Sequence, residues 1–178
     1  MKKWGFFFLL ILFFCVTFLN ELNNLDSELP DGLYHVVSER SEQLIQQAKA
    51  QGIEVMITDD FRSFEEQNHL YTKGRTTEGE IITHAQGGES YHNYGLAIDF
   101  ALLNQKKQPI WDMTFDDNGN GKSDWLEVVD IAKELGFQWG GDWQDFKDYP
   151  HLQMNFGRSI HDLQSGESPP RQSLYAGK

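Results

Sequence analysis

Residues 90–100 read SYHNYGLAIDF, and this stretch joins a histidine, a turn and a strand in one short segment. The apolar residues of LAIDF alternate with other residues, which is the period of a half-buried β-strand. Asp99 is therefore expected to point to the face opposite the apolar side chains, while Gly95 allows a tight turn that brings His92 back towards it. An imidazole and a carboxylate placed together are suitable ligands for Zn²⁺. Two ligands do not complete a site, so a third has to come from another part of the chain.

The best candidate for the third ligand is His151, in the segment DWQDFKDYPHLQM. Pro150 fixes the backbone just before this histidine, and the residues after it resume a strand-like pattern. Two histidines and one aspartate leave a fourth position open for water, as catalytic zinc requires. Asp148 precedes His151 across a Tyr-Pro turn and is a candidate for the carboxylate that takes a proton from that water.

The combined motifs resemble those of a known family. The pattern S-x-H-x-x-G-x-A-x-D of residues 90–99, followed by D-x-x-H of residues 148–151, is similar to that of the LAS metallopeptidases. This group includes VanY-like D-Ala-D-Ala carboxypeptidases, D-Ala-D-Ala dipeptidases and phage endolysins. The segments SYHNYGLAIDF, WGGDW and FKDYPHLQ most resemble bacterial and phage L-alanyl-D-glutamate endopeptidases, which cut the peptidoglycan stem peptide. The resemblance spans roughly residues 36–156.

The resemblance implies roles for five residues. His92, Asp99 and His151 would bind one zinc ion, and Asp148 would be the general base. Arg62, in the segment DDFRS, matches the family arginine that contacts substrate and stabilises developing negative charge. Arginine suits that role because its planar guanidinium can hold a carbonyl or a carboxylate with several donors. The implied reaction is hydrolysis of the bond between L-Ala and D-Glu.

Other residues near these motifs are candidates for binding substrate or for supporting the ligands. Ser90 matches the family serine that hydrogen-bonds substrate, although a serine at this position can equally cap a turn. Trp143 is expected to form a wall of the substrate groove, and Asp142 is a candidate for orienting a zinc-binding histidine. Residues 71–90 are expected to form a loop along the groove. His84 in this loop is a possible competing metal ligand, but we expect it to be a loop residue or to support the ligands.

A second metal-binding pattern lies in the segment DDNGNGKSDWLE, which fits the spacing D-x-N-x-N-G-x5-E of a calcium loop. The candidate calcium ligands are Asp116, Asn118, Asn120, Asp124 and Glu127. The residues before them do not predict a helix, so a complete helix–loop–helix unit is not expected. The alternative is an Asn-Gly turn that leads into a helix, with Asp124 as the N-cap and Glu127 completing a capping box.

The remaining pattern predicts an α+β domain. Apolar residues at helical spacing predict helices over residues 33–51 and 124–135, and a capping box predicts that a third helix begins at Ser63. Residues 53–57 alternate as a strand, and residues 137–139 form a short one. We expect a small antiparallel sheet that carries the zinc site on one face and helices on the other, as in the LAS and hedgehog-like peptidase fold.

The domain organisation follows from composition along the chain. Residues 1–19 contain two lysines followed by a nearly unbroken apolar run, which is typical of a signal peptide or a membrane anchor. Cys15, the only cysteine, lies in this run, so lipidation is a third option and no intrachain disulfide is possible. Residues 20–32 form a polar linker, residues 33–158 the zinc peptidase domain, and residues 159–178 a weakly ordered tail. The domain is therefore expected outside the cytoplasm, secreted to the cell wall or anchored to the membrane.

The overall charge narrows the choice of partners. The formal net charge is −12, which argues against binding nucleic acid or adhering electrostatically to anionic lipids. We expect a monomer that acts on peptidoglycan stem peptides and contacts the membrane only through its N-terminal segment. Two alternatives stay open: a D-Ala-D-Ala carboxypeptidase of the same fold, and a non-catalytic zinc-containing binding module.

Overall fold

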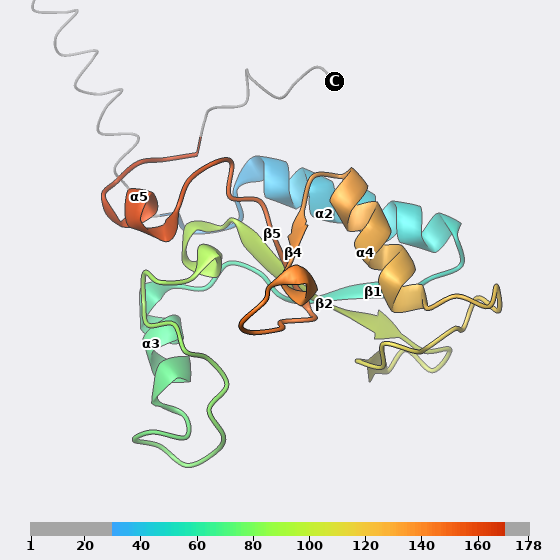
Figure 1. Cartoon of the computed structure of the whole chain (residues 1–178), viewed down its shortest axis with the longest axis horizontal. Coiled ribbons are helices and arrows are strands. Elements are labelled where there is room, and N and C mark those ends of the chain that lie inside the picture. The colour runs from blue at the N-terminus through green and yellow to red at the C-terminus, as the bar shows by residue number, and fades with distance from the viewer. Residues whose placement is uncertain (1–29, 170–178) are drawn as a thin grey trace, which may run out of the picture.

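A five-stranded antiparallel sheet and the helices around it make up residues 30–169, the part of the chain that the computed structural model describes (Figure 1). The elements in chain order are α2 (His35–Ala50), β1 (Val55–Asp59), α3 (Phe64–Thr72), the 3-10 helix η1 (Tyr91–Tyr94), β2 (Ala97–Leu103), β3 (Pro109–Ile110), α4 (Asp124–Glu134), β4 (Gln138–Trp139), the 3-10 helix η2 (Gly140–Asp142), β5 (His151–Gln153) and α5 (Ile160–Gln164).

Strand β2 is the longest strand and pairs with three others. The strand order is β1-β2-β5-β4, and β3 also pairs with β2. Asp99 of β2 lies opposite His151 of β5 on one side and opposite Asp59 of β1 on the other. Directly opposite residues of an antiparallel pair place their side chains on the same face of the sheet. The pairing of β2 with β5 therefore brings two of the predicted ligands together, although they are far apart in the sequence.

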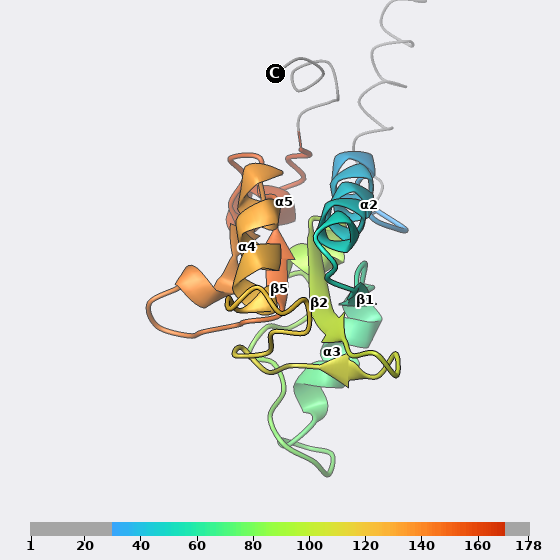
Figure 2. The ribbon, with the colours of Figure 1, turned by 90° about the vertical axis from the view of Figure 1, so that its right-hand side faces the viewer.

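The other face of the sheet is apolar and lies under helices α2 and α4, which pack side by side (Figures 1 and 2). Ile98, Phe100 and Leu102 alternate with the site-facing residues of β2 and are buried. The ring of Trp125, from α4, packs on Phe100 with the centroids 4.5 Å apart. Burial of each such side chain contributes about 1.5–3 kcal/mol to folding, so this layer fixes the position of β2. The predicted fold, an α+β domain with the site on one face and helices on the other, is confirmed.

The helix starts follow local capping. Helix α3 begins with the predicted capping box: the Glu66 backbone N–H donates to Ser63 Oγ over 3.2 Å, and the Ser63 N–H donates to the Glu66 carboxylate over 2.8 Å. Helix α4 is capped by Ser123, whose Oγ accepts from the Leu126 N–H over 3.2 Å. The expectation that Asp124 is the N-cap of this helix is therefore wrong, because Asp124 is its first residue.

The two ends of the chain bear on the predicted domain organisation. Residues 1–29 lie outside the described residues, and with them the predicted signal or anchor segment and most of the linker. Within residues 30–169, no helix is long and apolar enough to cross a membrane. Helix α5 falls in the segment predicted to be a weakly ordered tail, and its Leu163 is buried against the core. This part of the segment therefore packs on the domain.

Gly95 offers a test of how the turn before β2 is built. Its φ is +66°, and a Cβ there would lie 2.3 Å from the Gly32 carbonyl oxygen and 2.8 Å from the Tyr34 nitrogen. We expect Gly95→Ala to lower the free energy of unfolding by about 3 kcal/mol or more, since it combines backbone strain with a clash against main chain. Urea denaturation would measure the change.

Gly119 is the matched control, because its φ is +71° but no atom lies within 4 Å of an added Cβ. Gly119→Ala is expected to cost only about 1–2 kcal/mol, the left-handed strain alone. Equal losses for the two variants would contradict the role given to the close contact at Gly95.

Candidate metal centre

Three side chains from three separate segments converge on one point. His92 Nε2 lies 3.2 Å from His151 Nδ1 and 3.3 Å from Asp99 Oδ1, and His151 Nδ1 lies 3.2 Å from the same Asp99 oxygen. Among the described residues, His92, Asp99 and His151 form a group whose ligand atoms lie close enough together to hold a metal ion. The predicted ligands are thus brought together as the sequence motifs required.

Each ligand is positioned by its local structure. Asp99 and His151 are cross-strand partners on β2 and β5. His92 belongs to η1, which is capped at its start by Ser90 and ends at Gly95 in the left-handed conformation. The imidazoles of His92 and His151 are almost fully buried, with residue exposures of 3% and 6%. The side chains have little freedom to leave the site, so the geometry is set before any ion binds.

Hydrogen bonds on the far sides of both imidazole rings determine which nitrogen faces the centre. His92 Nδ1 lies 2.6 Å from the Asp60 carbonyl oxygen, which can only accept, so this nitrogen carries the proton. His151 Nε2 lies 3.0 Å from the Gln153 side-chain oxygen, so it donates in the same way. The two remaining nitrogens then present lone pairs to the Asp99 carboxylate. Three electron-pair donors facing one another are stable only around a cation, and this set of two imidazoles and a carboxylate fits Zn²⁺.

The titration of the site reflects the same need for positive charge. Burial disfavours the ionised form of Asp99. When a proton instead of a metal ion lies at the centre, hydrogen bonds from His151 and His92 outweigh burial and hold the pKa of Asp99 well below the ordinary value. Burial likewise disfavours the charged form of His151, but the Asp99 carboxylate raises its pKa above the ordinary value. Both shifts mean that the three groups together stabilise positive charge at their meeting point.

The metal centre opens into a cleft of about 930 Å³ whose walls include most of the predicted functional residues. Asp148 lines this cleft, and burial raises the pKa of its carboxyl above the ordinary value, which makes it a better proton acceptor. Trp143 also lines the cleft, with its ring centroid 5.2 Å from that of His151. Ser90 lines the cleft as well, and its Oγ accepts from the His92 N–H over 3.3 Å, the capping bond expected as its alternative role.

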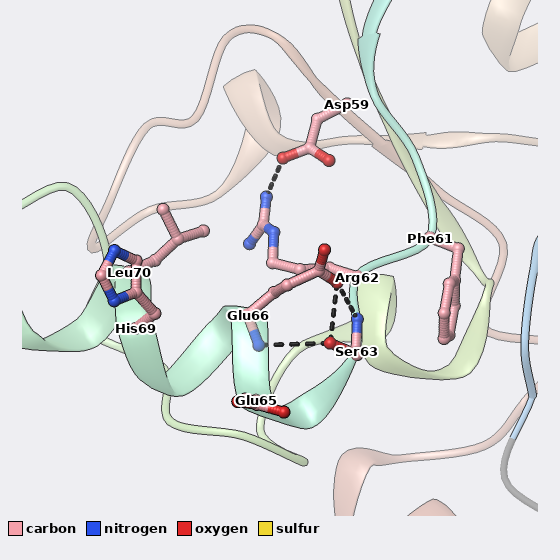
Figure 3. Close-up of a pocket in the computed structure, with 8 residues that line it drawn as sticks. All are labelled: Asp59, Phe61, Arg62, Ser63, Glu65, Glu66, His69 and Leu70. Carbon is pink, nitrogen blue, oxygen red and sulfur yellow. Dashed lines mark hydrogen bonds and ion pairs between the residues drawn. The ribbon is translucent and has the colours of Figure 1, made fainter.

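Arg62 lines both this cleft and a second hollow beside α3. Figure 3 shows the residues that line the second hollow. Its guanidinium forms an ion pair with Asp59, and its Nη1 donates to the Gln67 side-chain oxygen over 2.7 Å. The backbone of Arg62 is also tied to the metal centre, because its N–H donates to the His92 carbonyl over 3.1 Å. The predicted substrate arginine is therefore held at a fixed distance from a metal ligand.

Sequence reasoning missed the groups that support the ligands. The Asp60 carbonyl is a backbone atom and leaves no residue-type signal. Gln153 lies two residues after His151 on the same strand, and this period of two could have identified it. Asn93 is almost fully buried, accepts from the Gly88 N–H over 2.9 Å and donates to the Arg62 carbonyl over 2.8 Å.

One secondary expectation needs correction, and the alternative left open for His84 is decided. Asp142 does not orient a zinc histidine, because its carboxylate is exposed and forms an ion pair with Lys133 over 2.7 Å. His84 is not part of the group of three ligands, so its role as a loop residue is the one that fits. Its ring meets Phe146 edge to face at 6.1 Å, and both residues line the cleft.

The structure does not support the calcium prediction. The Asp116 carboxylate accepts backbone N–H groups of Gly119, Asn120 and Gly121, over 2.9 to 3.1 Å. Glu127 accepts from the side-chain amides of Asn118 and Asn120, so it does not complete a capping box. The Asp124 carboxylate accepts from the Asp117 N–H over 2.8 Å. The segment is closed by these hydrogen bonds, and its carboxylates do not form a metal-binding group among the described residues.

Metallopeptidases of the LAS type are the class in which this fold and this ligand set occur together. Residues 83–154 match a family model described as D-alanyl-D-alanine carboxypeptidase. Over 129 residues, 72% of this chain and 77% of the relative, the sequence is 60% identical to the peptidoglycan L-alanyl-D-glutamate endopeptidase CwlK of Bacillus subtilis (strain 168). The chain therefore belongs to this family of LAS-type, VanY-like zinc peptidases.

Other relatives agree in sequence or in fold. The L-alanyl-D-glutamate peptidase of Listeria phage A118 is 35% identical over 113 residues, which is 64% of this chain and 34% of the phage protein. The crystal structure of the L,D-carboxypeptidase DacB from Streptococcus pneumoniae covers 85% of this chain and 81% of its own, with a TM-score of 0.52 and 20% identity. That likeness extends to the fold alone.

Gln153 allows the support of the metal to be tested. Gln153→Leu removes the acceptor for His151 Nε2, and we expect the affinity for zinc to fall about 10- to 100-fold, because the ring loses its fixed orientation. Competition against a chromogenic chelator would measure the dissociation constant. The control is Gln138→Ala, since Gln138 contacts Gln153 over 3.2 Å but no ligand. Unchanged affinity in Gln153→Leu would show that the hydrogen bond does not tune the site.

Proposed function

We propose that this protein hydrolyses the bond between L-Ala and D-Glu in peptidoglycan stem peptides, using one zinc ion held by His92, Asp99 and His151. The observation that carries the proposal is the convergence of these three ligands in a cleft that also contains Asp148 and Arg62. The 60% identity to an enzyme named for this activity supports the choice of bond.

The chemistry divides between the ion and the side chains. When bound, zinc supplies Lewis acidity that polarises a carbonyl and lowers the pKa of water. Asp148 lines the same cleft and can accept the proton of the attacking water, and burial raises its pKa, which makes it a stronger base. The same carboxyl then returns the proton to the departing amine of D-Glu, so that it ends the cycle ionised.

Arg62 completes the site on the side of α3. Its guanidinium can donate hydrogen bonds to the carbonyl oxygen as negative charge develops, or hold a substrate carboxylate. Trp143 offers a flat apolar surface beside His151 against which the peptide can lie. The Ser90 hydroxyl oxygen accepts from the His92 N–H at the start of η1. Its proton can still be donated to substrate in the cleft, because a hydroxyl accepts and donates at the same time.

Replacing Asp148 tests the reaction. Asp148→Ala is expected to lower kcat about 10²- to 10⁴-fold, the usual contribution of a general base, while zinc remains bound. Mass spectrometry of purified muropeptides would identify the product: a new amine at D-Glu is expected. Loss of a single C-terminal D-Ala would instead identify a carboxypeptidase.

The matched control is Asp130→Asn, because Asp130 is an exposed carboxylate on α4, the helix that covers the opposite face of the sheet. It should leave activity unchanged. Full activity in Asp148→Ala would contradict the mechanism, and absence of any cleavage by the zinc-loaded native protein would favour a non-catalytic binding module.

The location of the protein follows from its substrate. Because peptidoglycan lies outside the cytoplasm, we place the domain there, with residues 1–19 acting as the signal peptide or anchor. Fractionation of cells that express the full chain is expected to recover it with the membrane or the wall. A variant that lacks residues 1–19 should stay in the cytosol. Recovery of the full chain from the cytosol would contradict export.

A further inference from the structure

Gln67 is a buried polar residue that the mechanism does not yet use. It is the one buried residue of α3 and has no exposed surface. A buried amide is costly unless its hydrogen bonds are made, and a leucine or methionine would fill the same space more cheaply if packing were its only role. The partners of Gln67 therefore indicate what it does.

One end of the Gln67 amide holds the guanidinium of Arg62. The Gln67 side-chain oxygen accepts from Arg62 Nη1 over 2.7 Å, and Arg62 Nη2 is held by Asp59. The two terminal nitrogens of the guanidinium, Nη1 and Nη2, are thus both bound by side chains of the protein, which leaves the group few orientations. Arginine side chains lose much conformational freedom on such fixation, and that loss has already occurred before substrate arrives.

The other end of the amide reaches the loop that follows α3. Gln67 Nε2 donates to the Ala85 carbonyl over 2.8 Å and to Thr83 Oγ1 over 3.2 Å. Thr83 and Ala85 line the cleft, as Arg62 does. One side chain therefore joins the arginine to the wall of the cleft next to it.

We propose that Gln67 is a positioning residue, which aligns the Arg62 guanidinium with the reacting carbonyl and sets it relative to residues 83–85. The inference rests on the proposed function, because it assumes that Arg62 acts on substrate. Gln67 itself touches neither the ligands nor the substrate; it acts through Arg62. Its loss should therefore slow turnover while the zinc site stays intact.

The test measures kcat for Gln67→Met in two backgrounds, the native protein and the Arg62→Ala variant. Gln67→Met keeps the volume but removes every side-chain hydrogen bond, and is expected to lower kcat about 10- to 100-fold, as for loss of a hydrogen bond to a charged group. Its zinc content should equal that of the native protein. In an Arg62→Ala background the same change should alter kcat less than about twofold, because two residues that act as one unit are not additive.

Asn68 provides the control for simple anchoring of the loop. Its side-chain oxygen accepts from the Gly87 N–H over 2.8 Å, so it ties the same loop to α3 without contacting Arg62. Asn68→Ala is expected to leave kcat within about twofold of native. Equal losses in Asn68→Ala and Gln67→Met, or a Gln67→Met loss that persists undiminished without Arg62, would overturn the proposal.

A second variant covers the case in which Gln67→Met does not fold. Gln67→Glu keeps an acceptor facing Arg62 but loses the amide donor to the Ala85 carbonyl and Thr83 Oγ1. Because the contact with Arg62 carries the effect on turnover, and a charged acceptor holds a guanidinium at least as well as an amide, kcat is expected to stay within about threefold of native. A fall in kcat as large as that of Arg62→Ala would overturn the proposal. Failure of the proposed function is separable from all these outcomes, since it would appear as absence of cleavage by the native protein.

Discussion

The structure depends on one electrostatic constraint: two imidazole lone pairs and a carboxylate oxygen meet within 3.2 to 3.3 Å of one another. In a buried setting these groups repel unless positive charge lies between them. The Asp60 carbonyl and the Gln153 side chain enforce that arrangement by fixing the proton on the far side of each ring. The described domain therefore provides a binding site for a cation at the point where His92, Asp99 and His151 meet.

Apolar packing, strand register and one tight turn bring the three ligands together. An apolar layer between β2 and the helices α2 and α4 fixes the central strand, and the register of β2 with β5 then sets Asp99 beside His151. The 3-10 helix η1, which Ser90 caps, returns His92 to the same point. It ends at Gly95 in the left-handed conformation, where a Cβ would clash with main-chain atoms. Stability and the metal site thus use opposite faces of one strand.

A connected set of polar groups extends the site towards substrate. The segment that follows β1 is bound to η1 through the His92 and Asn93 side chains and the Arg62 backbone, so the arginine and the metal ligand move together. Gln67 continues this connection to the loop at residues 83–85. Such pre-organisation is the usual way in which an enzyme stabilises developing charge without rearranging at the moment of reaction.

The sequence by itself predicted the three ligands that the structure brings together, the α+β class and the capping box at Ser63, because motif spacing, periodicity and capping are local properties of the chain. The roles of Asp148 and Arg62 came with the family resemblance and stay predictions. Two other sequence expectations were wrong, because Asp142 pairs with Lys133 and Ser123 caps α4. The calcium site expected in residues 116–127 is not supported. Gln153 shares the period of two with His151, so the sequence could also have identified it. Only the tertiary structure revealed the Asp60 carbonyl as the partner of His92 and the link from Gln67 to the Ala85 carbonyl. These contacts join segments that are distant in sequence, and no local pattern predicts them.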